Sequence, residues 1–300
     1  MTEERPIRIL LATDGSEDAV LATRVASDLA ARTASELRLV HVRQALPQGL
    51  YSGTYSEYYY RITEMEARRM LEEQVKHAKE SGAKVAETYL KMGPASLIIA
   101  DLAEQIDADL IVVGSRGLGP VDRIVLGSVS EGVVHHATRP TLVVRGGEAA
   151  WPPSRIVVGD DGSEDARRAG DLAARIGRLF DAPGVLVRAD PEPKLPPELP
   201  EYERELFRGL REENLERERK ALDHRAGELD ELLGVRPEVE LLADDPTAAI
   251  LEAAGEDESA LIAVGSRGRG AVSRTFLGSV STKVLRAARG PILICPRLDS

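Results

Sequence analysis

Hydrophobic residues along the chain follow two alternating patterns. Short apolar runs, such as RILLAT (Arg8–Thr13) and ADLIVVG (Ala108–Gly114), are typical of buried β-strands. Between these runs lie stretches with helical spacing of their apolar residues, such as ASLIIADLAEQI (95–106), which predict amphipathic helices. Alternating helices and fully apolar strands predict a parallel sheet that is covered by helices on both faces.

Both halves of the chain carry this pattern. In the first half, strands are expected at 8–13, 37–42, 84–90, 108–114 and 141–145. The helices of that half are expected at 16–32, 62–81, 95–106 and 127–138. In the second half, strands are expected at 155–160, 184–189, 237–242, 260–265 and 291–295. The helices of the second half are expected at 167–180, within 201–232, at 247–255 and at 278–289.

Sequence repeats indicate that the two halves are copies of one unit. The segment DGSEDA occurs at Asp14–Ala19 and again at Asp161–Ala166, each time after a strand pattern. We therefore predict two tandem domains, 1–147 and 154–300, joined by a linker at 148–153. Each domain is expected to be a doubly wound sheet of five parallel strands. One continuous sheet of ten strands is the disfavoured alternative, because each repeat holds a complete set of elements.

Composition narrows the class of protein. The 300 residues are 43% hydrophobic and 30% charged, which is typical of a globular protein, and the apolar runs are too short to cross a membrane. The N-terminus lacks the apolar core of a secretory signal and the single cysteine cannot form an internal disulfide, so we expect a cytoplasmic protein. The net charge of −11 argues against binding to nucleic acid or to an anionic membrane. A phosphate ligand would therefore need a local positive site.

One repeated motif is rich in glycine and serine. GSRGLGPVDRIVLGSVS (Gly114–Ser130) returns as GSRGRGAVSRTFLGSVS (Gly265–Ser281), with 12 of 17 positions identical. Both copies have the spacing Gly-x2-Gly-x9-Gly-Ser and follow the fourth strand of their unit. In open α/β sheets, ligands bind outside the carboxyl ends of strands where the strand order reverses. The motif and the Asp-Gly-Ser turn after the first strand both lie at such ends.

The motif has a structural explanation beside the functional one. Glycines can end strands, serines can cap helices, and recent duplication would copy any sequence. In the functional interpretation, the helix that starts at Gly127-Ser128 offers free N–H groups to an anion. A P-loop would need a lysine beside this Gly-Ser pair, and the dinucleotide fingerprint would follow the first strand. Neither of those phosphate motifs is present, and the position at the strand tips favours a different binding site.

Together, the Asp-Gly-Ser turn and the spaced glycine motif resemble the universal stress protein family over almost the whole chain. The resemblance implies two domains of the adenine nucleotide alpha hydrolase-like fold, with strand order 3-2-1-4-5. It also implies that ATP binds at the tips of strands one and four. In the first domain it implies that Asp14 holds the nucleoside, that the backbone of Val42 meets adenine, and that Gly114, Gly117, Gly127 and Ser128 surround ribose and phosphates.

The second domain retains the matching positions. They are Asp161, Ala189, Gly265, Gly268, Gly278 and Ser279. Ala189 offers less apolar wall to adenine than Val42 does, which favours the first site over the second. Arg116 and Arg267, inside the two loops, are candidates for neutralising phosphate charge, although solvated arginines explain them equally well. Asp14 and Asp161 can form Asx-turns as well as contact a ligand.

The resemblance favours an ATP-binding stress or regulatory protein whose nucleotide state, with or without Mg²⁺, changes its conformation or its partners. The alternatives are a slow ATPase or nucleotidyl-transfer enzyme of related fold, and a sensor of AMP or another adenine nucleotide. Neither glycine loop holds an evident carboxylate pair for fast hydrolysis, because Asp122 in the first becomes Ser273 in the second. We therefore predict no catalytic residue and no metal ligand.

Assembly and the remaining polar residues add further expectations. The resemblance implies an internal pseudo-dimer through 141–145 and 291–295, and a homodimer in addition, while the sequence names no regulatory partner. His41 is expected to be a packed or hydrogen-bonded residue, and Cys295 a buried strand residue. The tyrosine-rich stretch Tyr51–Tyr60 is expected to be a loop that forms a lid over the first site, a surface for a partner, or a segment packed on its own domain.

Overall fold

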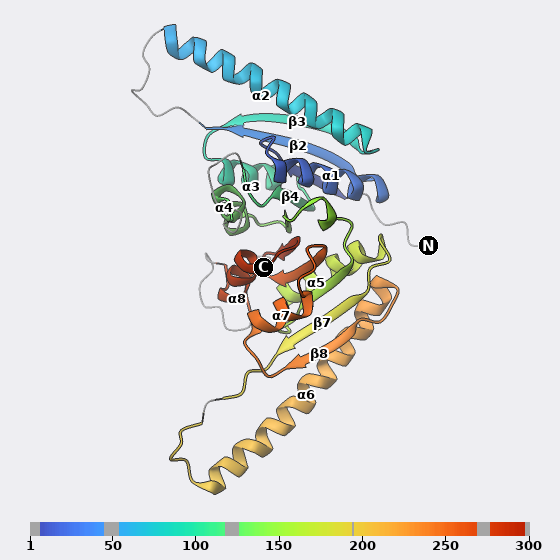
Figure 1. Cartoon of the computed structure of the whole chain (residues 1–300), viewed down its shortest axis with the longest axis vertical. Coiled ribbons are helices and arrows are strands. Elements are labelled where there is room, and N and C mark those ends of the chain that lie inside the picture. The colour runs from blue at the N-terminus through green and yellow to red at the C-terminus, as the bar shows by residue number, and fades with distance from the viewer. Residues whose placement is uncertain (1–6, 45–53, 118–125, 194, 269–276, 298–300) are drawn as a thin grey trace.

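A computed structural model describes residues 7–44, 54–117, 126–193, 195–268 and 277–297. All ten strands belong to one sheet, in the order β3-β2-β1-β4-β5-β10-β9-β6-β7-β8 (Figure 1). The strands of the first half are β1 (Arg8–Ala12), β2 (Glu36–Arg43), β3 (Lys84–Met92), β4 (Leu110–Gly114) and β5 (Thr141–Val144). Those of the second half are β6 (Arg155–Gly159), β7 (Gly184–Ala189), β8 (Glu238–Leu242), β9 (Ala260–Gly265) and β10 (Ile292–Cys295).

Each half keeps the expected doubly wound order. The strands of the first half lie in the order 3-2-1-4-5. Those of the second half have the same order when the sheet is followed from β8 back to β10, and pairing inside both halves is parallel. The α/β fold class that we predicted is therefore confirmed. The expected strand 108–114 is shorter in the structure, where β4 begins at Leu110.

The expectation of two separate sheets is wrong. The edge strands β5 and β10 pair antiparallel, with Ile292 opposite Val143 and Ile294 opposite Thr141, so that the halves share one continuous sheet. These strands lie in the two segments through which the resemblance implied an internal pseudo-dimer. The physical reason is that an open edge strand presents unpaired N–H and C=O groups. When β5 and β10 pair, the backbone groups of each strand form hydrogen bonds with those of the other.

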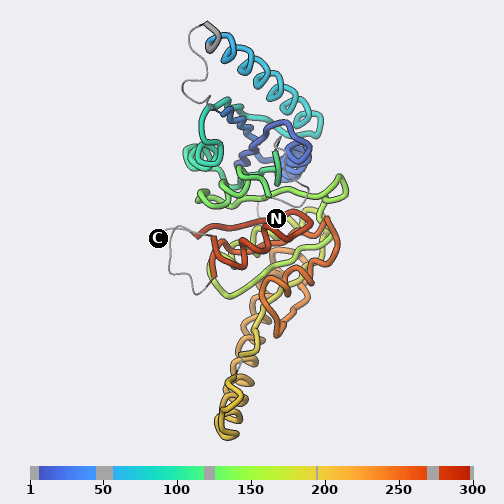
Figure 2. The backbone as a smooth tube through the Cα atoms, turned by 60° about the vertical axis from the view of Figure 1, so that its left-hand side comes forward, coloured from blue at the N-terminus to red at the C-terminus, as the bar shows by residue number. Residues whose placement is uncertain are grey.

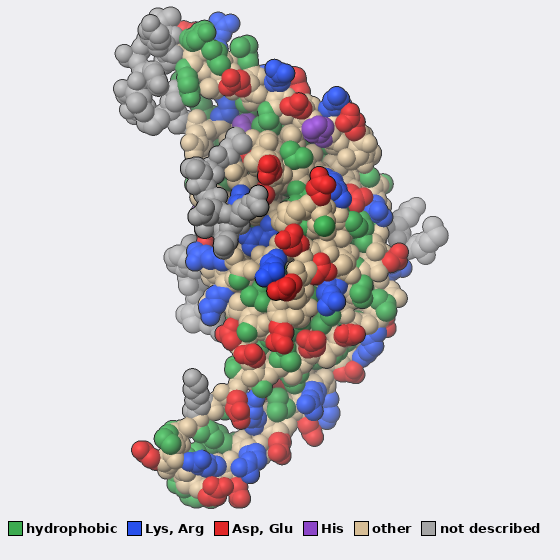
Figure 3. Space-filling view, viewed as in Figure 1, with side chains coloured by type: hydrophobic (Ala, Val, Ile, Leu, Met, Phe, Trp, Pro, Cys, Tyr) green, Lys and Arg blue, Asp and Glu red, His purple; other side chains and the backbone are tan. Residues whose placement is uncertain are grey.

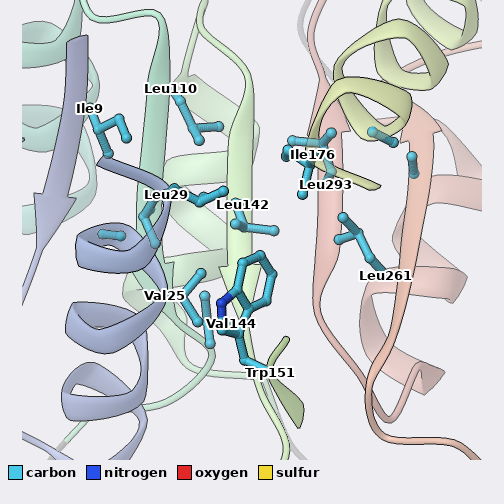
Figure 4. Packing of buried hydrophobic residues seen from close by; sticks show 14 of the residues in the cluster. Ile9, Val25, Leu29, Leu110, Leu142, Val144, Trp151, Ile176, Leu261 and Leu293 are labelled. Atoms are coloured by element: carbon cyan, nitrogen blue, oxygen red, sulfur yellow. The ribbon is translucent and has the colours of Figure 1, made fainter. Parts of the chain in front are cut away.

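Helices cover both faces of the sheet in the same arrangement in each half. The helices are α1 (Glu17–Arg32), α2 (Thr54–Glu80), α3 (Ala95–Gln105), α4 (Ser128–His136), α5 (Glu164–Arg178), α6 (Glu201–Leu233), α7 (Pro246–Ala254) and α8 (Ser279–Ala287). One core cluster joins the sheet to α1, α2, α5 and α6, and a second joins it to α3, α4, α7 and α8. Figure 4 shows Val25 and Leu29 of α1 packed over Ile9, Leu110 and Leu142.

The joint between the halves is packed with side chains from both. Trp151 is 2% exposed, its Nε1 donates to Asp28 Oδ2 at 2.9 Å, and its ring meets that of Phe180 edge-on at 5.0 Å. Arg145 Nη1 donates to the carbonyl oxygens of Leu285 and Ala288 at the end of α8. The segment 148–153, expected to be a plain linker, therefore contributes to the joint through a short 3-10 turn and a buried indole. The domain boundaries at 147 and 154 stay a prediction.

The two long helices project beyond the sheet. Helix α2 begins at Thr54 rather than near residue 62, so the described part of the tyrosine-rich stretch is helical and not the expected loop. Tyr58 is 65% exposed on this helix. The N-terminal ends of α2 and α6 extend to the same side of the molecule, the left in Figure 1, and Figure 2 shows α6 leaving the body. No helix among the described residues is long and apolar enough to cross a bilayer.

Candidate functional site

The sheet places two segments of each half at its ligand-binding edge. Helix α1 follows β1 on one face, and α4 follows β4 on the other, so a crevice opens between the carboxyl ends of these strands. The same geometry recurs between β6 and β9 in the second half. The Asp-Gly-Ser turns and the glycine motifs lie at these two crevices, as expected from the sequence.

In the second half, all the predicted site residues line a single cavity. The cavity has a volume of about 420 Å³, which falls within the range of roughly 300–1,000 Å³ that small-molecule sites occupy. Its lining includes Asp161, Ala189, Gly265, Arg267, Gly268, Gly278 and Ser279. Asp160, Pro246 and Ile250 also line it, and the sequence patterns did not single these three out. The cavity has carboxylates on one wall and a helix N-terminus on another.

The Asp-Gly-Ser turns have the same geometry in both halves. Asp14 Oδ1 accepts the N–H of Ser16 at 3.0 Å, and Asp161 Oδ1 accepts the N–H of Ser163 at 3.0 Å. The two serines cap α1 and α5 by accepting the N–H three residues on. The Asx-turn interpretation is thus confirmed, and a ligand contact by the second carboxylate oxygen stays a prediction.

The first and last glycines of each motif make room for the protein's own backbone. A Cβ on Gly114 would lie 2.7 Å from the carbonyl carbon of Asp18 in α1, and one on Gly265 would lie 2.7 Å from the amide nitrogen of Ala166. A Cβ on Gly127 would lie 3.0 Å from the Ser115 carbonyl oxygen. We expected Gly114 to bring backbone close to a ligand. In the structure, the space beside it is filled by helix α1, because the glycine lets β4 pass close to the start of that helix.

The middle glycine of each motif connects the motif to the Asp-Gly-Ser turn. A Cβ on Gly117 would collide with the carboxylate of Asp14, and one on Gly268 would lie 2.6 Å from Asp161 Oδ2. In both halves the colliding atom belongs to a side chain rather than to backbone. The glycine therefore lets the aspartate side chain lie against the loop. The fold thus brings together two motifs that are far apart in the sequence.

The helix that follows each motif begins without a side-chain cap. Gly127 is the N-cap of α4 and Ser128 is its first residue, and Gly278 and Ser279 have the same places in α8. The structural explanation, in which a serine caps this helix, therefore does not hold for Ser128, because the glycine before it takes the cap position. An uncapped first turn leaves backbone N–H groups for an anion, and the helix dipole favours the same charge.

The last serine of each motif, which sequence reasoning missed, holds the loop in place. Ser130 Oγ lies 2.8 Å from the Ser115 carbonyl oxygen and 2.9 Å from that of Gly127. Ser281 Oγ lies 2.7 Å from the Gly265 carbonyl oxygen. The sequence feature that could have identified this serine is the segment GSVS, which is identical in both copies and ends in it.

The loop arginine of the first half is committed to the protein. Arg116 Nη2 lies 2.7 Å from Asp18 Oδ1 and Nε donates to Asp18 Oδ2 at 3.0 Å. Asp18 is buried and also accepts the Ser115 hydroxyl at 2.6 Å. The hydrogen bond to Asp18 raises the pKa of Arg116 above its ordinary value. Arg116 is thus held by an ion pair within its own half, and its counterpart Arg267 lines the cavity of the second half.

The floors of the two crevices differ. In the first half, His41 Nδ1 lies 2.8 Å from the Thr13 carbonyl oxygen, which confirms a hydrogen-bonded histidine, and Val42 packs on the core. In the second half, Arg188 replaces the histidine and forms a buried ion pair with Asp160. Cys295 is the expected buried strand residue, and burial raises its pKa to about 12.

The remaining expectations from the sequence concern metal binding and hydrolysis. Among the described residues, no three His, Cys, Asp or Glu side chains are grouped as a metal site would require. Asp122 and Ser273, on which the argument about hydrolysis depended, lie outside the described residues.

Comparison with known proteins agrees with the fold and its motifs. The family model described as universal stress protein family matches residues 7–145 and 153–296. A universal stress protein from Mycolicibacterium smegmatis is 28% identical over 296 residues, covering 95% of this chain and 96% of its own. A putative universal stress protein from Staphylococcus aureus (strain USA300) is 40% identical over 142 residues, covering 46% of this chain and 82% of its own.

A solved structure extends the likeness to the whole fold. The crystal structure of a universal stress protein from Archaeoglobus fulgidus superposes with a TM-score of 0.68 at 24% identity, covering 98% of this chain and 97% of its own. Since the family model matches both halves and the tandem relative spans nearly the full length, the chain belongs to the universal stress protein family.

Proposed function

We propose that each crevice binds an adenine nucleotide, with ATP as the main ligand, and that the bound nucleotide regulates the protein in a stress response. The observation that carries this proposal is the cavity of the second half, which gathers Asp161, Gly268, Gly278 and Ser279 from two distant motifs. The family membership supports the same assignment, because the motif spacing resembles that of the family members that bind ATP.

The chemistry of the cavity suits a ligand that carries hydrogen-bond donors in one part and a negatively charged phosphate in another. Carboxylates accept hydrogen bonds from ribose hydroxyls or from an exocyclic amine, whereas an uncapped helix N-terminus favours phosphate. Arg267 adds positive charge to the lining of the cavity. Figure 3 shows positive and negative side chains mixed over one face of the protein. The net charge of −11 is therefore a sum over the whole chain and does not exclude local positive charge at a phosphate site. Mg²⁺, when it accompanies ATP, would be held by the phosphates.

The proposed role is nucleotide-dependent regulation rather than fast catalysis. A cytoplasmic location, a regulatory protein partner and a homodimer belong to the same proposal. Slow hydrolysis of ATP remains the second candidate, and turnover under excess ATP and Mg²⁺ separates the two. A rate above about 1 s⁻¹, within the usual range for enzymes, would assign the protein to the enzymes.

Binding can be tested with substitutions that reach only the site. Gly117→Val and Gly268→Val push aside an aspartate side chain, whereas substitutions of Gly114 or Gly265 would press on helix backbone and disturb folding. We expect calorimetry to find two ATP sites in the wild type, one in each single variant and none in the double variant. Mass spectrometry of denatured wild-type protein should identify the co-purifying nucleotide. Equal binding by wild type and double variant would overturn the proposal.

A further inference from the structure

Arg188 on β7 joins the cavity of the second half to helix α6. Its side chain is 7% exposed, which is rare for a charged group without partners. Its Nη2 donates to Asp160 Oδ2 at 2.5 Å and its Nε to the Asp160 carbonyl oxygen at 3.0 Å. Its Nη1 donates to Glu218 of α6. One guanidinium therefore fixes both a residue of the cavity wall and a residue of the long helix.

Asp160 in turn fixes the turn that presents Asp161. Asp160 Oδ1 accepts the N–H of Gly162 at 2.8 Å, and its own N–H donates to the Val187 carbonyl oxygen at 2.9 Å. The next residue, Asp161, lies against Gly268 of the glycine motif. A displacement of Arg188 would therefore move Asp160, and with it the carboxylate that we propose for ligand binding.

Glu218 lies where α6 leaves the body. We define the α6 arm as residues 201–221, because the buried residues of this helix begin at Leu222. Figure 1 shows the arm extending away from the sheet. Tyr202, Leu206 and Leu210 are exposed on it, and Arg211 donates to the Asp190 carbonyl oxygen at 3.0 Å. The ion pair with Arg188 is the innermost of the polar contacts that hold the arm.

The first half has neutral residues at the corresponding positions. Thr13 matches Asp160 and His41 matches Arg188 in the aligned repeats. The buried residues Leu71, Gln74 and Ala78 of α2 have the spacing of Leu222, Arg225 and Leu229 in α6, which places Ala67 at the position of Glu218. His41 contacts the Thr13 carbonyl oxygen, and a buried alanine carries no charge to anchor.

We propose that Arg188 is a positioning residue that couples nucleotide binding at the second site to docking of the α6 arm, a coupling that the first site lacks. The inference rests on the proposed function of this cavity. A buried guanidinium between two carboxylates is stable only while both contacts are made, because each lost contact leaves a buried charge without its partner. A ligand that holds the Asp160–Asp161 turn therefore favours the docked arm. By linkage, a docked arm favours the ligand equally.

The first test separates the sites and removes the link. In a Gly117→Val background, which leaves only the second site, Glu218→Ala should weaken ATP binding about tenfold, within the range of typical coupling. Glu213→Ala, an exposed position on the same arm, is the matched control and should leave affinity unchanged. In a Gly268→Val background, which leaves only the first site, Glu218→Ala should have no effect on ATP affinity.

The second test follows the arm itself. Hydrogen exchange of peptides within 201–221 should slow when ATP is added to the wild type and to Gly117→Val, but not to Gly268→Val. The triple variant Asp160→Thr, Arg188→His, Glu218→Ala gives the second half the residues of the first. In the Gly117→Val background, exchange in its arm should no longer respond to ATP at concentrations that calorimetry shows to fill the second site.

The outcomes distinguish this inference from the proposed function. If Gly117→Val binds no adenine nucleotide, the function assigned to the second cavity is wrong and the coupling is wrong with it. If ATP binds but exchange in the wild-type arm does not change, the coupling alone is overturned. A response of the arm that persists in the triple variant, or a loss of ATP affinity at both sites in Glu218→Ala, would also overturn it, since either result assigns the residue a general structural role.

Discussion

The two halves share a fold and a glycine motif, but they differ in the layer between the sheet and its long helix. In the first half the buried contact between α1 and α2 is neutral, with the Thr23 hydroxyl donating to Gln74 Oε1 at 2.7 Å, while the ion pair of Arg43 in β2 with Glu64 in α2 is longer, at 3.8 Å. In the second half it is ionic, with Arg225 bound to Asp171 at 2.6 Å and to Glu228 at 2.9 Å. The halves therefore use different chemistry to attach the same helix.

The difference indicates that, between the two halves, residues at neighbouring buried polar positions are substituted together. Gly170 stands where Thr23 would be, and a Cβ there would lie 2.9 Å from Arg225 Nη2. The glycine thus provides the space that the arginine occupies. A lone buried charge is costly, whereas one with its partners is tolerated, so duplicated halves can diverge here only through compensated substitutions. The glycine motif, which packs against backbone in both halves, has less freedom to change.

The largest effect is expected from removing the central charge of the ionic layer. Arg188→Ala leaves the buried carboxylate of Asp160 without its ion pair and removes one contact of the half-buried Glu218, and should lower the free energy of unfolding by about 3–5 kcal/mol. His41→Ala, at the matching position, removes one hydrogen bond and should cost about 1 kcal/mol. Denaturant unfolding of the two variants measures the difference. Equal losses would show that the two layers are energetically alike.

An intermediate effect is expected from exchanging one residue between the layers. Gly170→Thr crowds Arg225 and should destabilise the protein by about 1–3 kcal/mol, the usual cost of overpacking. Adding Arg225→Gln rebuilds the neutral pair of the first half and should recover part of that loss. A double-mutant cycle measures the coupling, which we expect to be at least about 0.5 kcal/mol in favour of the pair. Strict additivity would contradict the matched-set interpretation.

A similar or smaller loss is expected at the loop of the first half. Arg116→Ala leaves the buried carboxylate of Asp18 with the Ser115 hydroxyl but without its ion pair, and should cost about 1–3 kcal/mol. Arg69→Ala, at an exposed position of α2, is the control and should stay within about 0.5 kcal/mol of wild type. If Arg116→Ala lowered ATP affinity without a loss of stability, Arg116 would instead be a phosphate ligand.

The smallest effect concerns pH. Burial raises the pKa of Asp165, the counterpart of Asp18, above the ordinary carboxyl value of 3.8. A raised pKa means that ionisation opposes folding, so the penalty is present above the raised pKa and disappears as pH falls to 3.8 and below. Asp165→Asn removes this penalty. Its stability relative to wild type should therefore be highest near neutral pH and decline as the solution is acidified through the raised pKa, which thermal unfolding at several pH values would reveal. A difference that does not vary with pH would contradict the assignment.

Much of the fold could be predicted because it depends on local pattern. Apolar runs and helical spacing located all ten strands and the covering helices, and the DGSEDA repeat identified the duplication. The residues that the sequence named for a second-half site also lie together, since all of them line one cavity. The start of α2 at Thr54 was missed because the tyrosine-rich sequence before residue 62 has no clear amphipathic pattern.

The sequence by itself determined the repeated unit and the edge of the sheet at which the two motifs meet, and the strand order followed from the family resemblance. Only the tertiary structure decided what those residues touch. Arg116 forms its ion pair with Asp18, which is 98 positions away in the sequence. Gly114 is needed because helix α1 passes beside it. The continuous sheet is a tertiary outcome as well, because edge strands pair through backbone groups that every residue carries, so side-chain patterns cannot say whether β5 will meet β10.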